Sequence, residues 1–480
     1  MLVEVLRGCA RAVRNQERIR CEVFLFFLKE EDIMKFRRVL GVTMIGGALL
    51  LNGNHVQAET LQEAVGAILK TNPDVRSIAH NRLGRDEEVR QARSGYLPQV
   101  DFIAGYGIQE IQEPVSDSLN PQQFTLSLRQ NVFRGFATQN EIERQQARVR
   151  SEAYGLQGAS ENTALRTAEV YLNVLRQQEL LRLAEENLNS HLRVGDQIKL
   201  RSDSGVASKS DSDQVTGRVS LAHSNVVVAK INLQDAQSNY LAVVGHLPAD
   251  LQQPAPPPDS LMPATLEEAE DLAVKQHPTL KSAGADLDAR QKQHEVAKAP
   301  YLPVIDLELD QNWEKDFDTS GSNDSLVAMI KLRYNLFRGF YDQARRAETI
   351  ELVSEAREIK NGTHRQVIEA MRLSWMAHQA VKDRIKYLEQ RVASTVETAD
   401  SYTQQFNISK RTLLDVLDTE AEVIDAKRAL VEARTDGLFA QYRILNGLGQ
   451  LVKSFELEWP KESQVDGDDE GKTKRKENNS

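Results

Sequence analysis

The sequence predicts a mainly α-helical protein that also carries strands of a membrane β-barrel, and three observations support this fold class. A segment that begins at Leu61 reappears at Leu266, so the chain contains two copies of one unit. Two long windows lack proline and show the apolar spacing of coiled-coil helices. Four shorter stretches alternate apolar and polar residues, as half-buried strands do. Together they predict a strand–strand–long helical hairpin unit that occurs twice.

The duplication depends on matches at a nearly constant offset. Tyr96–Leu97–Pro98 reappears as Tyr301–Leu302–Pro303, at an offset of 205. Asn131–Phe136 and Asn335–Phe340 agree at five of six residues, at an offset of 204. Such agreement at one spacing indicates duplication of a long unit, and two copies are too few for a solenoid.

The N-terminus has the pattern of a secretory signal. Basic residues after Met34 precede a 13-residue apolar run, Val39–Leu51, and then a small-residue cleavage site that ends at Ala58. We therefore expect translation to begin at Met34. Cys9 and Cys21 both precede the cleavage point, so the mature chain would carry no cysteine and no disulfide.

These features predict the following order along the chain. The predicted segments are an upstream extension or mis-assigned start (1–33), a signal peptide (34–58), a first repeat (59–247), an extended proline-rich linker (248–264), a second repeat (265–453) and a charged disordered tail (454–480).

Proline placement predicts where the long helices lie. No proline occurs between Pro121 and Pro248, or between Pro303 and Pro460. Apolar residues in these windows recur at steps of 3 and 4, which forms a stripe that needs partner helices. We expect helical hairpins over about 136–246 and 340–448. On this evidence alone a soluble coiled-coil protein would be the favoured interpretation.

The stretches before each hairpin favour a membrane protein instead. Strands are predicted at about 98–108, 122–132, 303–313 and 325–336. Each has about ten residues, enough for a tilted strand to cross a bilayer. An amphipathic sheet covered by soluble structure is the alternative. In a barrel, the polar face would line water and the other face would meet outer membrane lipid; the charged residues on the polar face are Arg129, Asp306, Glu308, Asp310, Lys331 and Arg333.

Four strands cannot close a barrel, because an open edge in lipid leaves backbone groups unpaired. The smallest single-chain barrels have about eight strands. Closure therefore requires several copies of the chain. Three copies would supply twelve strands, and we infer a trimer; a dimer that closes eight strands is the geometric alternative.

Composition and motifs exclude several functions. The 480 residues carry a net charge of −10, which argues against nucleic acid as a partner. The chain has no HExxH metal motif and no GxxxxGK[ST] nucleotide loop. We therefore expect a passive conduit with no cofactor and no bound metal, and not an enzyme.

At this point the residues resemble a known family. The signal peptide, the duplicated unit, the Tyr–Leu–Pro entry to each first strand and the Phe–Arg–Gly–Phe after each second strand are similar to TolC-family outer membrane channels. The most specific match is Arg411–Asp418, with the sequence RTLLDVLD, which resembles the family's periplasmic-tip motif. The opening of the first repeat is most similar to members that serve type I secretion systems.

The resemblance implies a homotrimer with a twelve-stranded barrel in the outer membrane of a Gram-negative cell and an α-helical tunnel through the periplasm. It implies two further partners: a periplasmic adaptor (membrane fusion) protein, and an inner-membrane transporter that is either an ABC protein or proton-driven. The implied function is passive export, most consistent with type I secretion of an adhesin or repeat-rich exoprotein. A multidrug or metal efflux channel is the alternative within the family. A periplasmic coiled-coil structural or adaptor protein is the alternative from another class.

The tip motif supplies the candidate gate. Asp415 and Asp418 lie three residues apart on one helix face, and in a trimer they would form a ring of six carboxylates. We expect crowding to raise some of their pKa values and to attract cations. Arg411 would help to hold neighbouring hairpins together. The plain alternative is a solvated helix face with an ordinary ion pair.

Both hairpin tips are expected to dock the adaptor. The residues assigned to this docking surface are Gly205, Ser208, Asp211, Ser409 and Thr412.

Overall fold

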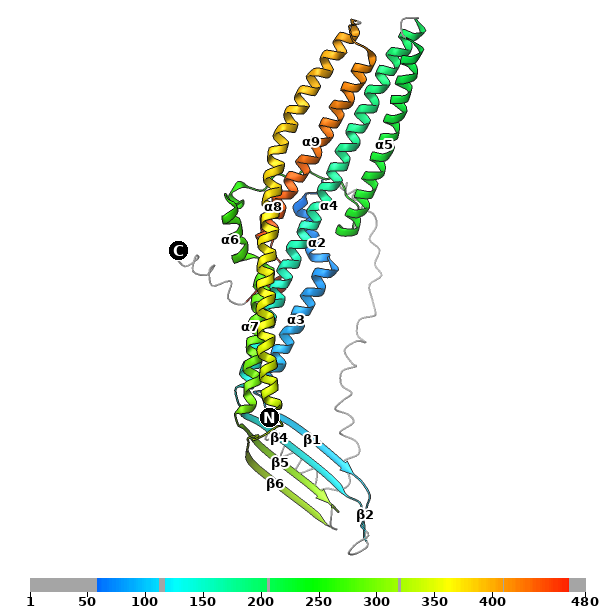
Figure 1. Ribbon diagram of the computed structural model, residues 1–480. Coiled ribbons are helices and arrows are strands. Elements are labelled where there is room, and N and C mark those ends of the chain that lie inside the picture. The colour runs from blue at the N-terminus through cyan, green and yellow to red at the C-terminus, as the bar shows by residue number, and fades with distance from the viewer. Residues whose placement is uncertain (1–57, 112–116, 205–207, 318–320, 409, 466–480) are drawn as a thin grey trace, which may run out of the picture. The chain divides into compact units, whose positions relative to one another are not determined.

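The computed structural model describes residues 58–111, 117–204, 208–317, 321–408 and 410–465 (Figure 1). The predicted extension 1–33 and the predicted signal, apart from Ala58, lie outside these residues. Gly205 and Ser409, two of the predicted docking residues, also lie outside them.

Each repeat places a pair of helices before its strands and a long hairpin after them. The pairs are α2 (Leu61–Thr71) with α3 (Pro73–Ser94), and α6 (Leu266–Gln276) with α7 (Pro278–Lys298). The hairpins are α4 (Ala137–Asp203) with α5 (Lys209–Val244), and α8 (Tyr341–Asn407) with α9 (Leu413–Gly447). Among the described helices, none is both long enough and apolar enough to span a bilayer.

The helix pairs break at the same place in both repeats. Asn72 ends α2 and caps α3, because its side-chain oxygen accepts hydrogen bonds from the backbone N–H of Asp74 and Val75 at 2.8 and 3.2 Å. His277 caps α7 in the same way with a ring nitrogen, because its Nδ1 accepts from the backbone N–H of Thr279 at 3.2 Å. Proline follows each of the two, as Pro73 and Pro278, and cannot continue the preceding helix.

Four antiparallel strands form one sheet in the order β1-β4-β5-β6 (Figure 1). The sheet joins the two repeats, because β4 of the first pairs with β5 of the second. The four strands match the predicted positions closely and are β1 (Gln99–Tyr106), β4 (Gln122–Arg134), β5 (Val304–Lys315) and β6 (Ser322–Arg333).

Two details of the sheet differ from the expectation. β6 ends at Arg333, before the predicted end at 336, and the Asn335 side chain then accepts a hydrogen bond from the Phe337 N–H at 3.1 Å. This local turn replaces further strand pairing. The predicted polar loop after β1 contains a short hairpin of its own, formed by β2 (Gln109–Ile111) and β3 (Asp117–Leu119).

The repeated Phe–Arg–Gly–Phe motif forms the turn from strand to long helix. Gly135 and Phe136 have φ of 56° and 63°, and Gly339 and Phe340 have φ of 60° and 62°. The two phenyl rings of each motif meet edge to face, with centroids 5.2 Å apart in the first repeat and 5.3 Å in the second. The motif therefore encodes two consecutive left-handed residues and an aromatic contact that fixes them.

The main core lies where both hairpins pack against α2, α6 and the segment that begins at Leu451. Tyr171 of α4, Tyr240 of α5 and Tyr442 of α9 are fully buried there. The Tyr171 hydroxyl lies 2.7 Å from the Glu59 carbonyl oxygen and 2.6 Å from the Gln252 carbonyl oxygen. These contacts anchor both the start of the first repeat and the linker, which is otherwise mostly exposed.

The charged tail begins later than residue 454, its predicted start. Residues after 453 continue the fold through α10 (Leu451–Ser454) and a 3₁₀ turn, Lys461–Ser463. The Trp459 indole N–H and the backbone N–H of Leu451 both donate to the carboxylate of Glu161 on α4, at 2.8 Å. Apolar packing of Leu457 and Trp459 against the core adds to this anchor, so only residues after 465 remain as candidates for the tail. The other two short 3₁₀ turns in the described chain are Asp259–Leu261 and Ala299–Tyr301.

Candidate functional site

Both hairpins carry the same cap at their tips. The hydroxyl of Ser208 accepts from the Asp211 N–H at 3.1 Å, and the Asp211 carboxylate accepts from the Ser208 N–H at 3.1 Å. Thr412 and Asp415 repeat this reciprocal pair at 3.3 and 3.1 Å. These capping boxes begin α5 and α9 and place three predicted docking residues, Ser208, Asp211 and Thr412, at the tips.

The Asp415 carboxylate contacts Thr412, the N-cap residue of its own helix, α9. Hydrogen bonds from the Thr412 side chain and backbone lower the pKa of Asp415, and the nearby charge of Arg411 lowers it further. The direction is opposite to that expected for a crowded ring of carboxylates. In the single protomer the cap, and not crowding, sets the charge of Asp415.

Arg411 lies against its own hairpin. Its Nε donates to the Gln405 side chain at 3.1 Å, and its guanidinium carbon lies 4.1 Å from the ring centroid of Tyr402. Its Nη1 is 3.9 Å from Asp415 Oδ2. The ordinary pairing of Arg411 with Asp415 is therefore present, and among the described residues these three contacts of Arg411 all lie within its own hairpin.

Asp418 instead reaches across to the first hairpin. Its Oδ1 lies 2.6 Å from Nη2 of Arg218 on α5. Arg218 was not singled out from the sequence. At the offset of 204, Arg218 aligns with Glu422 of α9, so the two repeats carry opposite charges at that position, but this difference does not point to Asp418.

An apolar cluster below the caps also joins the hairpins. It brings together Ile198 of α4 and Val215 of α5 with Leu413, Val416 and Leu417 of α9. Phe406 of α8 completes it, and the guanidinium carbon of Arg201 on α4 lies 4.6 Å from the Phe406 ring centroid. Within the described part of the chain, the two tips are therefore held to each other by this packing, by the contact of Arg201 with the Phe406 ring and by the ion pair of Arg218 with Asp418.

The strand register brings the six predicted lumen residues onto one face of the sheet. Arg129 stands opposite Glu308, and Asp306 stands opposite Lys331. Directly opposed residues point to the same side, and successive residues alternate. The six residues that share the face are Arg129, Asp306, Glu308, Asp310, Lys331 and Arg333.

The charges on this face are partly paired. Lys331 contacts Glu308, which is buried, and Arg333 lies 3.7 Å from Asp306. The Asn131 side chain also donates to Asp306, at 2.7 Å. The opposite face is apolar, and its residues include Phe102, Leu126, Leu307 and Ile330.

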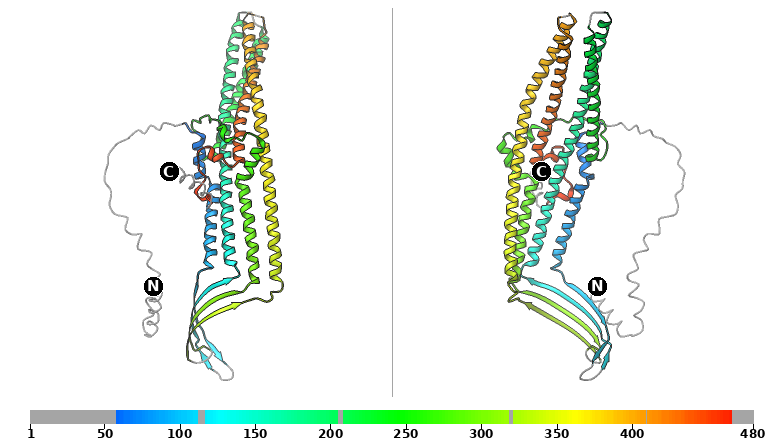
Figure 2. Two further views of the ribbon diagram at one scale, coloured as in Figure 1. Left: turned by 90° about the vertical axis from the view of Figure 1, so that its left-hand side faces the viewer. Right: turned by 45° about the vertical axis from the view of Figure 1, so that its right-hand side comes forward.

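In the described ranges of the chain, no strand pairs with either outer edge of this sheet. β1 and β6 are the outer strands in the order β1-β4-β5-β6, and Figure 2 shows the sheet as an open curved ribbon. Large apolar side chains at these edges are exposed, including Phe102 and Tyr106 on β1 and Leu326 and Ile330 on β6.

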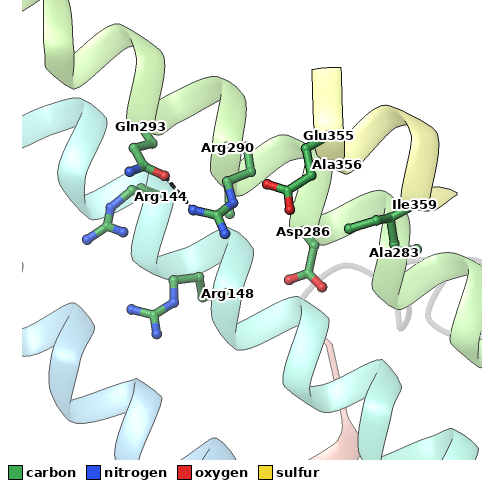
Figure 3. A pocket seen from close by; sticks show the side chains of 10 residues that line it. Arg144, Arg148, Ala283, Asp286, Arg290, Gln293, Glu355, Ala356 and Ile359 are labelled. Atoms are coloured by element: carbon green, nitrogen blue, oxygen red, sulfur yellow. Dashed lines mark hydrogen bonds between the residues drawn. The ribbon is translucent and has the colours of Figure 1, made fainter. Parts of the chain in front are cut away.

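A cavity of about 380 Å³ lies among α4, α7 and α8, and charged side chains of both signs line it (Figure 3). Arg144 pairs with Glu141 at 2.7 Å and Arg148 with Glu88 at 2.7 Å, so two of its arginines already have partners. Within the described ranges, no group of three or more His, Cys, Asp and Glu side chains is placed to hold a metal ion.

Comparison with known proteins identifies the class. The family model described as "Outer membrane efflux protein" matches residues 64–246 and 270–450. These two ranges contain the tip residues of both hairpins and all four strands of the larger sheet. The chain therefore belongs to the outer membrane efflux protein family.

Individual relatives agree with this assignment. The outer membrane efflux protein BepC of Brucella suis is 24% identical over 85% of this chain and 90% of its own. The outer membrane protein TolC of Escherichia coli is 25% identical over 82% of this chain and 83% of its own. The proteases secretion protein PrtF of Dickeya chrysanthemi is 22% identical over 84% of this chain and 91% of its own.

Solved structures share the fold. The Campylobacter jejuni outer membrane channel CmeC superposes with a TM-score of 0.73 at 13% identity, over 92% of this chain and 98% of its own. The predicted fold of the protomer, in which a strand–strand–long helical hairpin unit occurs twice, is confirmed. As a member of this family the chain is a transport conduit of the outer membrane and not an enzyme. The alternative from another class, a periplasmic coiled-coil structural or adaptor protein, is therefore rejected.

Proposed function

We propose that three copies of this chain close one barrel, with β6 of each copy paired to β1 of the next. The observation that supports this is the pair of unpaired edges, β1 and β6, in a sheet whose two faces are already sorted into polar and apolar. Each protomer leaves backbone groups on β1 and β6 without strand partners, which lipid does not tolerate. In the closed barrel the face that carries Arg129, Glu308 and Lys331 lines water, and the apolar face meets lipid.

The tip is the gate of this channel. In a trimer, Asp415 and Asp418 of three protomers surround the narrow end and favour cations there. The cap holds Asp415 in place, and the contact of Asp418 with Arg218 ties the second hairpin to the first. Arg411, which lies against its own hairpin, is available to a neighbouring protomer through its exposed side.

Bilayer recordings test the gate. We expect trimers that carry Asp415→Ala and Asp418→Ala to lose most of their cation selectivity and their block by divalent cations, because the carboxylates that attract cations are gone. Asp196→Ala, at an exposed position on α4, is the matched control and leaves both properties unchanged. Unchanged cation selectivity and unchanged divalent block in the double variant would contradict the assignment of Asp415 and Asp418 to the gate.

The tips also dock a periplasmic adaptor, which links the channel to an ABC or proton-driven transporter of the inner membrane. Ser208, Asp211 and Thr412 are exposed or half-exposed and lie at the ends of the hairpins, where such a partner can reach them. Gly205 and Ser409, outside the described residues, complete the proposed docking surface.

The cargo is protein, exported by a type I system. The name of PrtF, a proteases secretion protein that matches most of this chain, supports this cargo. The name of BepC, an outer membrane efflux protein, favours small-molecule efflux as the second candidate.

A deletion strain separates the two cargoes. If the channel serves type I secretion, the culture medium loses one or more abundant exoproteins, and the wild-type gene restores them. An unchanged secretome, together with increased sensitivity to antibiotics or metals, would reject protein secretion and support efflux.

A further inference from the structure

Polar groups interrupt the apolar contact between the two hairpins. We use the name hairpin seam for Asn187, Ser190 and His191 of α4 together with Glu420 of α9. His191 belongs to the stripe of α4 that faces its partners, because Leu183 and Ile198 of the same stripe are 1% and 2% exposed. This spacing places an imidazole at a position that coiled coils normally fill with an apolar side chain.

The polar atoms of the hairpin seam are buried and incompletely paired. His191 is 5% exposed. In the described chain, Asn187 Oδ1, His191 Nδ1 and Glu420 Oε2 are buried without a hydrogen-bond partner. His191 Nδ1 lies 3.7 Å from Glu420 Oε2, which is too far for a good hydrogen bond. The other Glu420 oxygen accepts from Ser190 Oγ at 2.7 Å.

Charges reach the imidazole from more than one helix. Glu420 of α9 favours its protonated form, and Arg218 of α5, which pairs with Asp418, opposes it. Further along the same contact, Lys427 of α9 pairs with Glu186 of α4 at 2.9 Å. From α8, Tyr402 packs against the adjoining apolar cluster.

We propose that the hairpin seam is a proton-responsive lock, in which His191 stays uncharged while the hairpins are packed and takes up a proton when they part. The proposal rests on the proposed function, because it concerns the gate of that channel. Acid conditions would therefore favour the parted hairpins, and the channel would open more readily in an acidified periplasm.

The direction follows from linkage. Burial is the main cause that lowers the pKa of His191 in the packed hairpins, and the charge of Arg218 adds to it against the opposing charge of Glu420. The packed form therefore binds the proton less tightly than the parted form. Its stability is complete above the ordinary histidine pKa of about 6.5 and decreases as the pH falls below that value.

Thiol accessibility measures this change without relying on conduction. The sequence from Ala58 onward contains no cysteine. In a chain of these residues, Ile198→Cys therefore places a single thiol in the buried tip cluster, and Ser220→Cys places one at an exposed site on α5. The ratio of their modification rates at each pH removes the intrinsic pH dependence of the reagent. We expect this ratio to rise between pH 7.5 and pH 5.5 by up to about tenfold, the limit for a group that binds no proton in the packed form.

Variants assign the effect to His191. In a His191→Gln background the ratio stays flat, whereas His223→Gln, at an exposed histidine of α5, leaves the rise intact. Glu420→Gln makes the rise at pH 5.5 larger, because the carboxylate that favours the imidazolium is gone. A flat ratio in the otherwise unchanged protein, or a rise that persists in His191→Gln, would overturn the proposal.

Bilayer recordings of the same variants distinguish failure of the proton-responsive lock from failure of the proposed channel. If the wild-type trimer conducts but its opening does not increase at pH 5.5, the lock is rejected and the channel stands. If no variant conducts at any pH while the thiol ratio rises as expected, the proton-dependent parting of the hairpins stands and the proposed trimeric channel with its gate at the tips is rejected.

Discussion

Arg218 and Asp418 form the ion pair that ties the two hairpins together at their tips. Their side chains are 33% and 52% exposed, and exposed pairs of this kind contribute about 1 kcal/mol or less. The pair is therefore a weak link, which suits a contact that has to break when the tips separate.

Removing the ion pair of Arg218 with Asp418 should raise the open probability of the channel by a small factor. We expect Arg218→Ala to increase the open probability of the reconstituted channel by about fivefold or less per protomer. The combined charge reversal Arg218→Asp with Asp418→Arg restores the wild-type value, because the pair is remade. Single-channel recording measures both, with Arg193→Ala at an exposed site of α4 as control. No change in Arg218→Ala, or failure of the charge reversal to restore closure, would contradict this role.

Glu161 is a second residue whose charge depends on its surroundings. It is 2% exposed, and burial raises its pKa to about 7, although the hydrogen bonds from Trp459, Leu451 and Val452 oppose that rise. The folded state therefore binds a proton more tightly than the unfolded chain. Its contribution to stability is present at acid pH and is lost as the pH rises from about 4.5 to about 7.

Thermal unfolding of Glu161→Gln tests this assignment. The wild type loses about 3 kcal/mol per protomer between pH 4.5 and pH 7 through this one carboxyl, and the variant does not. We expect the difference in unfolding temperature between the two proteins to change over that interval. Glu185→Gln, at an exposed site of α4, behaves as the wild type. A difference that does not vary with pH would mean that Glu161 does not titrate in this range.

At the scale of elements, the turn from strand to long helix is the most constrained connection. Phe136 and Phe340 have positive φ, which costs a non-glycine residue about 1 kcal/mol or more. A Cβ added to Gly135 would lie 2.5 Å from the carbonyl oxygen of Ala299, whereas nothing within 4 Å of Gly339 would meet one. The two copies of the motif share a conformation but differ in what surrounds them.

This difference predicts that alanine substitutions at Gly135 and Gly339 lower the stability of the protein by unequal amounts. Gly339→Ala costs about 1 kcal/mol through backbone strain, and Gly135→Ala costs at least about twice as much because the Ala299 region must also move. The unfolding temperatures of the two purified variants compare them directly. Equal losses would indicate that strain alone decides both.

The long elements could be predicted from the sequence because local patterns specify them. Alternation of apolar and polar residues determined the strands, and the absence of proline allowed α4 and α8 to run for 67 residues each. The shared face of Arg129, Glu308 and Lys331 followed from the same alternation. By contrast, the contacts of Arg218 with Asp418 and of Trp459 with Glu161 join residues about 200 to 300 positions apart, and no local pattern specifies such pairs.

The disordered tail was predicted to start too near the core for a related reason. The segment after residue 453 is rich in charged residues, and composition alone favours disorder. Its few apolar side chains, Phe455, Leu457 and Trp459, nevertheless pack against the core formed by both repeats. A short segment can therefore be ordered by a core that lies far from it in the sequence.

At the scale of the whole molecule, duplication determines how the chain assembles. β4 and β5 already join one repeat to the next inside the protomer, so pairing of β6 with the β1 of another copy would repeat that junction between copies. The exposed apolar edges of the sheet are then covered, and the polar face encloses water. Each protomer would then supply one third of the barrel.

Native mass spectrometry of the mature protein, extracted from outer membranes in detergent, tests this central claim most directly. We expect a particle that contains three copies of the chain and that precipitates when detergent is removed without lipid. A stable monomer in plain buffer, or a particle of two copies, would contradict it.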